Sequence, residues 1–135
     1  MPNSLPALES SRASLLRQIA QLGDMRPGSV TTVFRRCGKP TCHCARPNDP
    51  GHGPHFQLTS KQEGKTVTQS LSHAAAVKKV EQEIAEFRHF EKLSHSLIEV
   101  NQKICQLRPV AELATPWTAE EKKRLMQSIK KSHAR

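Results

Sequence analysis

Residues 37–55 read CGKPTCHCARPNDPGHGPH, a stretch that holds three cysteines, three histidines and many glycines and prolines. Such a density of glycine and proline interrupts helices and strands and predicts an irregular loop. A loop of this kind needs a further constraint if it is to keep one conformation. The clustered cysteines and histidines are suited to supply it, because thiolates and imidazoles are the ligands that zinc takes in structural sites.

Four side chains of this stretch are expected to bind one structural zinc ion: Cys37, Cys42, Cys44 and His52. Cys44 lies two positions after Cys42, so both sulfurs can face one point only if the backbone bends between them. His52 is favoured as the histidine ligand because Gly51 and Gly53 would let the backbone approach the metal closely. Three thiolates and one imidazole leave zinc no open position, so the site is expected to stabilise the fold and not to catalyse.

Two alternatives to this assignment stay open. His55 is an alternative fourth ligand, although it falls at the start of an expected strand, where its side chain can simply pack. A redox centre is the alternative use of the thiols, because the basic neighbours Arg35, Arg36 and Lys39 would also stabilise a reactive thiolate. The sequence has no nucleophile elbow, phosphate loop or two-histidine zinc helix, so we expect that the chain is not an enzyme.

The chain is strongly basic, with 21 Lys and Arg against 12 Asp and Glu, a formal net charge of +9 and a pI near 9.8. This balance favours a nucleic acid partner, with DNA expected, because each neutralised phosphate releases counterions. The basic residues around the motif have two possible roles, which are to offset the negative charge of the zinc site or to contact phosphate. The residues expected to contact nucleic acid are Arg35, Arg36, Lys39 and Arg46, with Lys61 and Lys65 from the neighbouring hairpin.

The segments on either side of the loop predict a small antiparallel sheet within residues 26–72. Residues 29–34, SVTTVF, are rich in the β-branched and aromatic residues that strands favour. Residues 55–60 and 66–71 have the same character and are joined by a polar turn at 61–64. The simplest arrangement is a three-stranded sheet whose first connection is the zinc-binding loop.

The longest expected helix lies in residues 73–108, where no glycine or proline occurs before Pro109 and apolar residues recur at threes and fours after a Ser72 N-cap. Its first half would face the sheet. The apolar residues of its second half, within 87–107, would pack against an N-terminal amphipathic helix in residues 1–25 or against another subunit as a coiled coil. Packing against another subunit predicts a homo-oligomer or a protein partner.

Residues 109–135 predict a linker and a basic helix that starts with a capping box between Thr118 and Glu121. The fold class is therefore α+β. No run reaches the roughly 18 apolar residues that a membrane span needs, and the start of the chain lacks a secretory pattern. A cytoplasmic location is expected, where clustered cysteines are more often metal ligands than disulfides. Cys105 stands far from the cluster and is expected to be buried.

Several short motifs resemble a family of small uncharacterised bacterial proteins that carry a domain of unknown function, over about residues 26–105. They are CGKP at 37–40 followed by Cys42 and Cys44, HGP at 52–54, KT at 65–66 and FRHF at 87–90. Members of that family have an aromatic residue at the position of His55, and some lie near mobile elements. The resemblance supports the cysteine and histidine assignment and implies no activity.

Together with the charge, these features predict a zinc-stabilised nucleic-acid-binding accessory or regulatory protein, for example one that acts beside a transposase. The alternative is an assembly module that oligomerises through its long helix, with the zinc purely structural.

Overall fold

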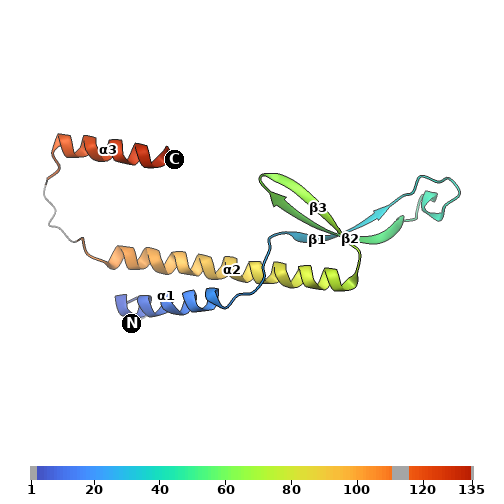
Figure 1. Ribbon diagram of the computed structural model, residues 1–135, viewed down its shortest axis with the longest axis horizontal. Helices are drawn as coiled ribbons and strands as arrows, with labels where there is room; N and C mark the ends of the chain where they lie inside the picture. The colour runs from blue at the N-terminus through green and yellow to red at the C-terminus, as the bar shows by residue number, and fades with distance from the viewer. Residues whose placement is uncertain (1–2, 111–115, 135) are drawn as a thin grey trace.

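The structure is a computed structural model in which residues 3–110 and 116–134 are described. It confirms the α+β class, with one antiparallel sheet and one long helix (Figure 1). Residues 111–115, which fall in the expected linker, lie outside the described residues. The elements in chain order are α1 (Leu5–Ala20), β1 (Ser29–Arg35), the short 3-10 helix η1 (His43–Ala45), β2 (His52–Gln62), β3 (Lys65–Leu71), α2 (Ala74–Leu107) and α3 (Ala119–His133).

The sheet has the order β1-β2-β3, and both pairs are antiparallel. β2 starts three residues earlier than predicted, because the pairing of Arg35 with His52 continues the β1–β2 ladder beyond an irregularity after Val33. A side chain at position 53 would not fit this pairing, since a Cβ on Gly53 would lie 2.8 Å from the Val33 carbonyl oxygen. The glycines that predicted a break in the strand therefore allow two strands to come close.

The core lies where one face of the sheet meets the first part of α2. Leu58 and Leu71 from the sheet pack with Val80 and Ile84 from the helix, and all four side chains are buried. Burying an aliphatic side chain of this size stabilises a fold by roughly 1.5–3 kcal/mol. The expectation that the first half of the long helix faces the sheet is confirmed.

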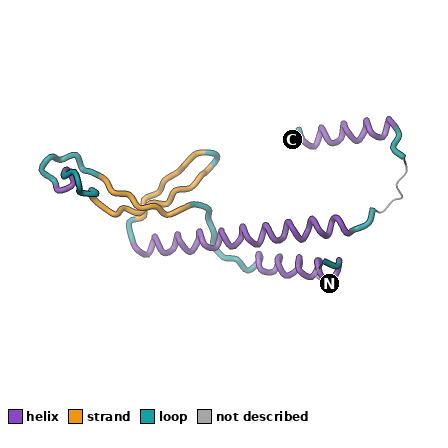
Figure 2. The backbone as a smooth tube through the Cα atoms, turned by 180° about the vertical axis from the view of Figure 1, so that it is seen from behind, coloured by secondary structure: helices purple, strands orange, loops and turns teal. Residues whose placement is uncertain are grey.

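The second half of α2 packs against α1, which runs antiparallel beside it (Figure 2). Glu9 near the start of α1 forms an ion pair with Arg108, at 2.9 Å, while the backbone nitrogen of Gly23, beyond the end of α1, donates to Glu86 at 3.4 Å. Leu8, Leu93 and Ile104 are buried along these two helices. Of the two partners that the sequence left open for residues 87–107, the N-terminal helix occupies this surface within the chain.

Three details of the helices test sequence predictions. The N-cap of α2 is His73, without a side-chain cap bond, so the prediction of Ser72 was wrong by one position. The capping box of Thr118 and Glu121 is confirmed. Cys105 is exposed, contrary to expectation. It follows the buried Ile104 by about 100° around the helix and therefore points away from α1.

Every described residue of α3 is exposed. Among the described residues, no helix combines the length and the apolar character that crossing a membrane requires.

Candidate metal centre

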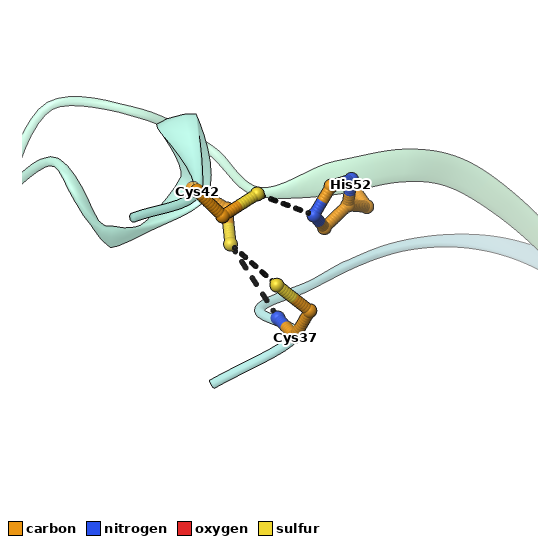
Figure 3. A group of neighbouring side chains, drawn as sticks. Cys37, Cys42 and His52 are labelled. Atoms are coloured by element: carbon orange, nitrogen blue, oxygen red, sulfur yellow. Dashed lines mark hydrogen bonds between the residues drawn. The ribbon is translucent and has the colours of Figure 1, made fainter. Parts of the chain in front are cut away.

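The pairing of two strand ends brings the first and last of the predicted ligands together. β1 ends at Arg35, two residues before Cys37, and β2 begins at His52, which pairs with Arg35. Cys37 and His52 therefore leave the same end of the sheet and face each other across the loop of residues 36–51, which we call the metal loop (Figure 3).

Two tight turns in the metal loop position the other two cysteines. The backbone nitrogen of Cys42 donates to the Lys39 carbonyl at 3.2 Å, which closes the turn after Cys37. Cys42 is the N-cap of η1, and Cys44 lies inside it with its side chain fully buried. The 3-10 turn supplies the bend that the spacing of Cys42 and Cys44 required, and both sulfurs reach one point.

The four predicted ligands form a compact set, with all ligand atoms within 4.8 Å of one another. The Sγ atoms of Cys37 and Cys44 are 3.5 Å apart, and Cys42 Sγ lies 3.2 Å from His52 Nε2. Tetrahedral zinc with Zn–S bonds of about 2.3 Å and Zn–N bonds of about 2.0 Å places its ligands roughly 3.5–3.8 Å apart. This cluster could therefore hold a metal ion with little rearrangement.

The other histidines of the motif lie outside the cluster. His55 pairs with Val33 on the strand ladder and is exposed. His43 Nδ1 lies 3.0 Å from Asp49 Oδ2, and its ring packs edge-on against His52 with the centroids 4.8 Å apart. His52 is thus the only histidine among the described residues whose ring nitrogen joins the three sulfurs.

The thiols of the cluster differ in their acidity. The pKa of Cys37 is lowered to about 6, first by the backbone hydrogen bond from Lys39 and then by hydrogen bonds with His52 and Cys44. The backbone nitrogen of Cys37 donates to Cys44 and favours its thiolate, but burial and the neighbouring thiols outweigh this bond and raise the pKa of Cys44. The thiolate is the form of cysteine that binds metal. With its lowered pKa, the exposed Cys37 is largely a thiolate near neutral pH and can bind a cation.

The side chain of Arg36 points into the metal loop and forms hydrogen bonds with its backbone. Its Nη1 donates to the carbonyls of Cys44 and Arg46, and its Nη2 donates to the carbonyl of Asp49 at 2.8 Å. One planar guanidinium thereby joins three backbone carbonyls of the metal loop. The residue was expected to contact nucleic acid, and in this structure its donors are used within the chain.

Asp49 fixes the last turn before His52. Its Oδ1 accepts from the Gly51 backbone nitrogen at 2.8 Å, and its Oδ2 contacts His43. The pKa of Asp49 is lowered, first by the hydrogen bond from His43 and then by the one from Gly51. The Asp-Pro-Gly sequence at 49–51 is a recognisable turn signal that could have predicted this role. No comparable sequence signal exists for Arg36, because its role depends on where distant carbonyls point.

The glycines beside His52 serve the strand pairing. A Cβ on Gly51, whose φ is +103°, would lie 2.8 Å from the Arg35 carbonyl oxygen. We expected these glycines to let the backbone approach the metal, whereas the close approach is to the backbone of β1. The effect on His52 is the same, since the pairing is what places its ring at the cluster.

The expected nucleic-acid-binding residues fall into two groups. Arg35, Lys39 and Arg46 lie at the metal end of the sheet, and Lys61 and Lys65 lie beside the β2–β3 turn at the other end (Figure 1). Lys61 lies nine positions after His52 on β2, and at about 3.3 Å per residue this separates the two by roughly 30 Å. The two groups lie at opposite ends of the sheet, because antiparallel pairing sends the hairpin away from the metal loop.

Comparison with known proteins identifies the family of the chain. No curated protein and no solved structure matches the chain. A family described as domain of unknown function (DUF6788) matches residues 5–82. The match takes in α1, the sheet, the metal loop and about the first quarter of α2, so it begins earlier and ends earlier than the resemblance suggested. This chain is therefore a member of the family with the domain of unknown function DUF6788.

Proposed function

We propose that the chain is a nucleic-acid-binding accessory protein whose metal loop is held by one structural zinc ion. The observation that carries the proposal is the placement of Arg35, Lys39 and Arg46 around the Cys3His cluster. These three cations are exposed and form no ion pair within the described residues. A fixed loop that presents unpaired cations is suited to the phosphates of a polyanion.

The chemistry of the ligands supports zinc. Three sulfurs and one imidazole nitrogen at tetrahedral spacing match the ligand sets of structural zinc sites, whereas calcium and magnesium take oxygen ligands. With four protein ligands the ion would keep no position for a substrate. We therefore assign the metal to the stability of the loop and propose no catalytic role.

The distribution of charge supports nucleic acid as the partner. Residues 26–72 contain seven Lys and Arg but only Asp49 and Glu63 as acidic residues. Asp49 and Glu63 together offset only two of these seven positive charges. Most of the excess positive charge of the chain thus belongs to the family-matched β module, and a partner rich in phosphate complements it.

The zinc assignment is tested by the metal content of the untagged protein and of two variants. We expect about one equivalent of zinc in the wild type, near zero in Cys42→Ser, and an unchanged content in His55→Ala, which lies outside the cluster. Wild-type protein without bound zinc after purification in zinc-containing buffer would overturn the assignment.

The nucleic-acid assignment is tested by the salt dependence of binding, measured by fluorescence anisotropy with labelled DNA and RNA. The unpaired cations of the β module are Arg35, Lys39, Arg46, Lys61 and Lys65. Five phosphate contacts predict an affinity loss of roughly 10²–10³-fold between 50 and 200 mM salt. Absence of binding at low salt, or binding that is indifferent to salt, would refute the proposal.

Self-assembly through the helices is the second candidate function. Ile98 on α2 is 54% exposed and Leu16 on α1 is 50% exposed, so packing between α1 and α2 leaves large apolar side chains uncovered. A second copy would bury them. Ile98→Asp should then convert a dimer to a monomer in analytical ultracentrifugation, and a monomeric wild type would exclude this candidate.

A further inference from the structure

The β2–β3 hairpin projects from the fold as an arm that nothing covers. All residues from 61 to 70 are exposed, on both faces of the two strands. β1 reaches only as far as the pair Ser29–Thr59, so the arm beyond it is a ribbon of two strands (Figure 1). An exposed ribbon of this length buries no core, which leaves its side chains available for a partner.

The register divides the side chains of the arm between two faces. Leu58 is buried against α2, and its strand partner Gln69 shares its face. The next residue along β3, Thr68, pairs with Thr59 on the opposite face, which we call the open face. The open face carries Lys61 and Thr66 in the two-stranded part of the arm, and it continues over Gln57, Thr59, Thr68 and Ser70 where β1 joins the sheet. It thus consists of hydroxyls, one amide and one amine, with no carboxylate.

We propose that this arm lies in the major groove of duplex DNA with its open face toward the base edges. The inference rests on the proposed nucleic-acid-binding function and specifies the surface and the form of the partner. The major groove of B-form DNA, about 12 Å wide, admits a two-stranded β ribbon, and two strands are about 4.8 Å apart before their side chains are added. Amide and hydroxyl groups can donate to and accept from base edges in that groove.

The composition of the arm favours a duplex over a single strand. Proteins that bind single strands stack bases on aromatic side chains. Residues 57–70 contain no aromatic residue. Duplex RNA is also disfavoured, because its major groove is too narrow and deep for protein side chains to read.

The two basic groups lie at suitable distances for this arrangement. Lys61 and Lys65 border the turn, while Arg35, Lys39 and Arg46 lie roughly 30 Å away along β2. At 3.4 Å per base pair this distance is about nine base pairs. With the open face in the groove, cations at both ends of the sheet reach phosphates, which orients the arm along the duplex.

The test compares two neighbouring substitutions that add the same negative charge to opposite faces. Thr68→Glu places a carboxylate on the open face, and Gln69→Glu places one on the other face, both at exposed positions. We expect Thr68→Glu to weaken binding to a 16-base-pair DNA duplex at least tenfold, and Gln69→Glu to weaken it less than threefold, as measured by fluorescence anisotropy at constant salt. Zinc content and thermal unfolding of both variants check that the fold is intact.

Each outcome bears on a distinct claim. Equal losses for the two variants, or no loss for Thr68→Glu, would overturn the placement of the arm while leaving nucleic-acid binding in place. Tighter binding of wild type to single-stranded DNA or to duplex RNA of equal length would overturn the choice of duplex DNA. If the wild type bound none of these at low salt, the proposed function would fail first.

Discussion

Arg36 has a role in the structure that its charge did not indicate. It stands among basic residues beside the metal ligands, which made it a candidate for phosphate contact, yet its guanidinium donates to the carbonyls of Cys44, Arg46 and Asp49. The bond to the Cys44 carbonyl is partly buried and would be costly to lose, whereas the bonds to Arg46 and Asp49 are exposed, so water can replace their donor.

We predict that Arg36→Lys lowers the stability of the protein by about 1 kcal/mol, because an ammonium cannot replace the planar guanidinium that donates to three carbonyls. Its neighbour Arg35 makes no such contacts among the described residues and is the control. Arg35→Lys should leave the unfolding midpoint in urea unchanged. Equal effects of the two substitutions would contradict the structural role given to Arg36.

Gly51 gives a second prediction at this scale. A Cβ at this position would meet the Arg35 carbonyl oxygen at 2.8 Å, and the positive φ of the residue is itself unfavourable for alanine. Gly51→Ala should therefore separate His52 from the three sulfurs and weaken zinc binding at least tenfold in a competition titration with a chromophoric chelator. Gly38→Ala is the matched control, since its φ is also positive but nothing lies within 4 Å of the added atom. Similar zinc affinities for the two variants would refute the role of the close approach.

The four residues of the Cys/His cluster could be predicted from the sequence, because few residue types bind metal ions such as zinc and the loop offers them at close spacing. The choice between His52 and His55 depended on strand pairing. The early start of β2 at His52 was hidden by glycines and a proline, which usually indicate that a strand is interrupted. Whether these glycines interrupt β2 or let it pair closely depends on where they lie relative to the β1 backbone, and sequence alone does not give those positions.

At the scale of elements, α2 packs against the sheet with its first part and against α1 with its second part. Glu83 lies between these two contacts. Its carboxylate is buried and accepts from Lys79 Nζ at 2.8 Å, while Arg26 Nε lies 3.1 Å from Oε1 without the alignment of a hydrogen bond. The backbone of Arg26 also donates to the Glu83 carbonyl at 3.2 Å. The segment between α1 and β1 is thereby attached to the long helix.

This attachment predicts a pH dependence of stability. The pKa of Glu83 is lowered from its ordinary value of 4.5, first by the hydrogen bond from Lys79 and also by the charge of Arg26. A carboxylate with a lowered folded pKa contributes its stability above the unfolded value and loses it as the pH falls through the folded value. The contribution of Glu83 is thus complete at neutral pH and lost in acid below 4.5.

Glu83→Gln should cost about 1–2 kcal/mol of unfolding free energy at pH 7, and the difference from wild type should shrink below pH 4.5. The magnitude is modest because the side chains of Lys79 and Arg26 are 64% and 38% exposed. Glu81→Gln, an exposed position on the same helix, is the control in the same urea titrations. A deficit for Glu83→Gln that persists undiminished in acid would argue against the ionic contribution.

At the scale of the whole molecule, the apolar core and the metal cluster are separate. Leu58, Leu71, Val80 and Ile84 form the core under the sheet, and none of them is a ligand or lies in the metal loop. The length and apolar pattern of α2 were clear in the sequence. The separation of the two groups of basic residues could not be seen in the sequence, because the length of β2 carries Lys61 and Lys65 far from the metal loop.

Removal of the metal should therefore damage the molecule locally. We expect protein treated with a chelator to keep most of its helical circular dichroism, because the contacts of α1 and α2 do not involve the cluster. The thermal midpoint should fall by more than about 5 °C, since even 1 kcal/mol shifts the midpoint of a small domain by roughly 4–8 °C. Loss of the whole helical signal at room temperature would show that the helices depend on the metal.

The pairing of Arg35 with His52 finally has a consequence for the order in which the protein assembles. Once β1 and β2 have joined, Cys37 and His52 are already neighbours, and only the intervening loop has to settle before an ion is enclosed. We therefore expect metal binding to follow strand pairing in time, because the paired strands leave only a short loop to be closed. Slow or defective strand pairing would appear as slow metal uptake, even with every ligand intact.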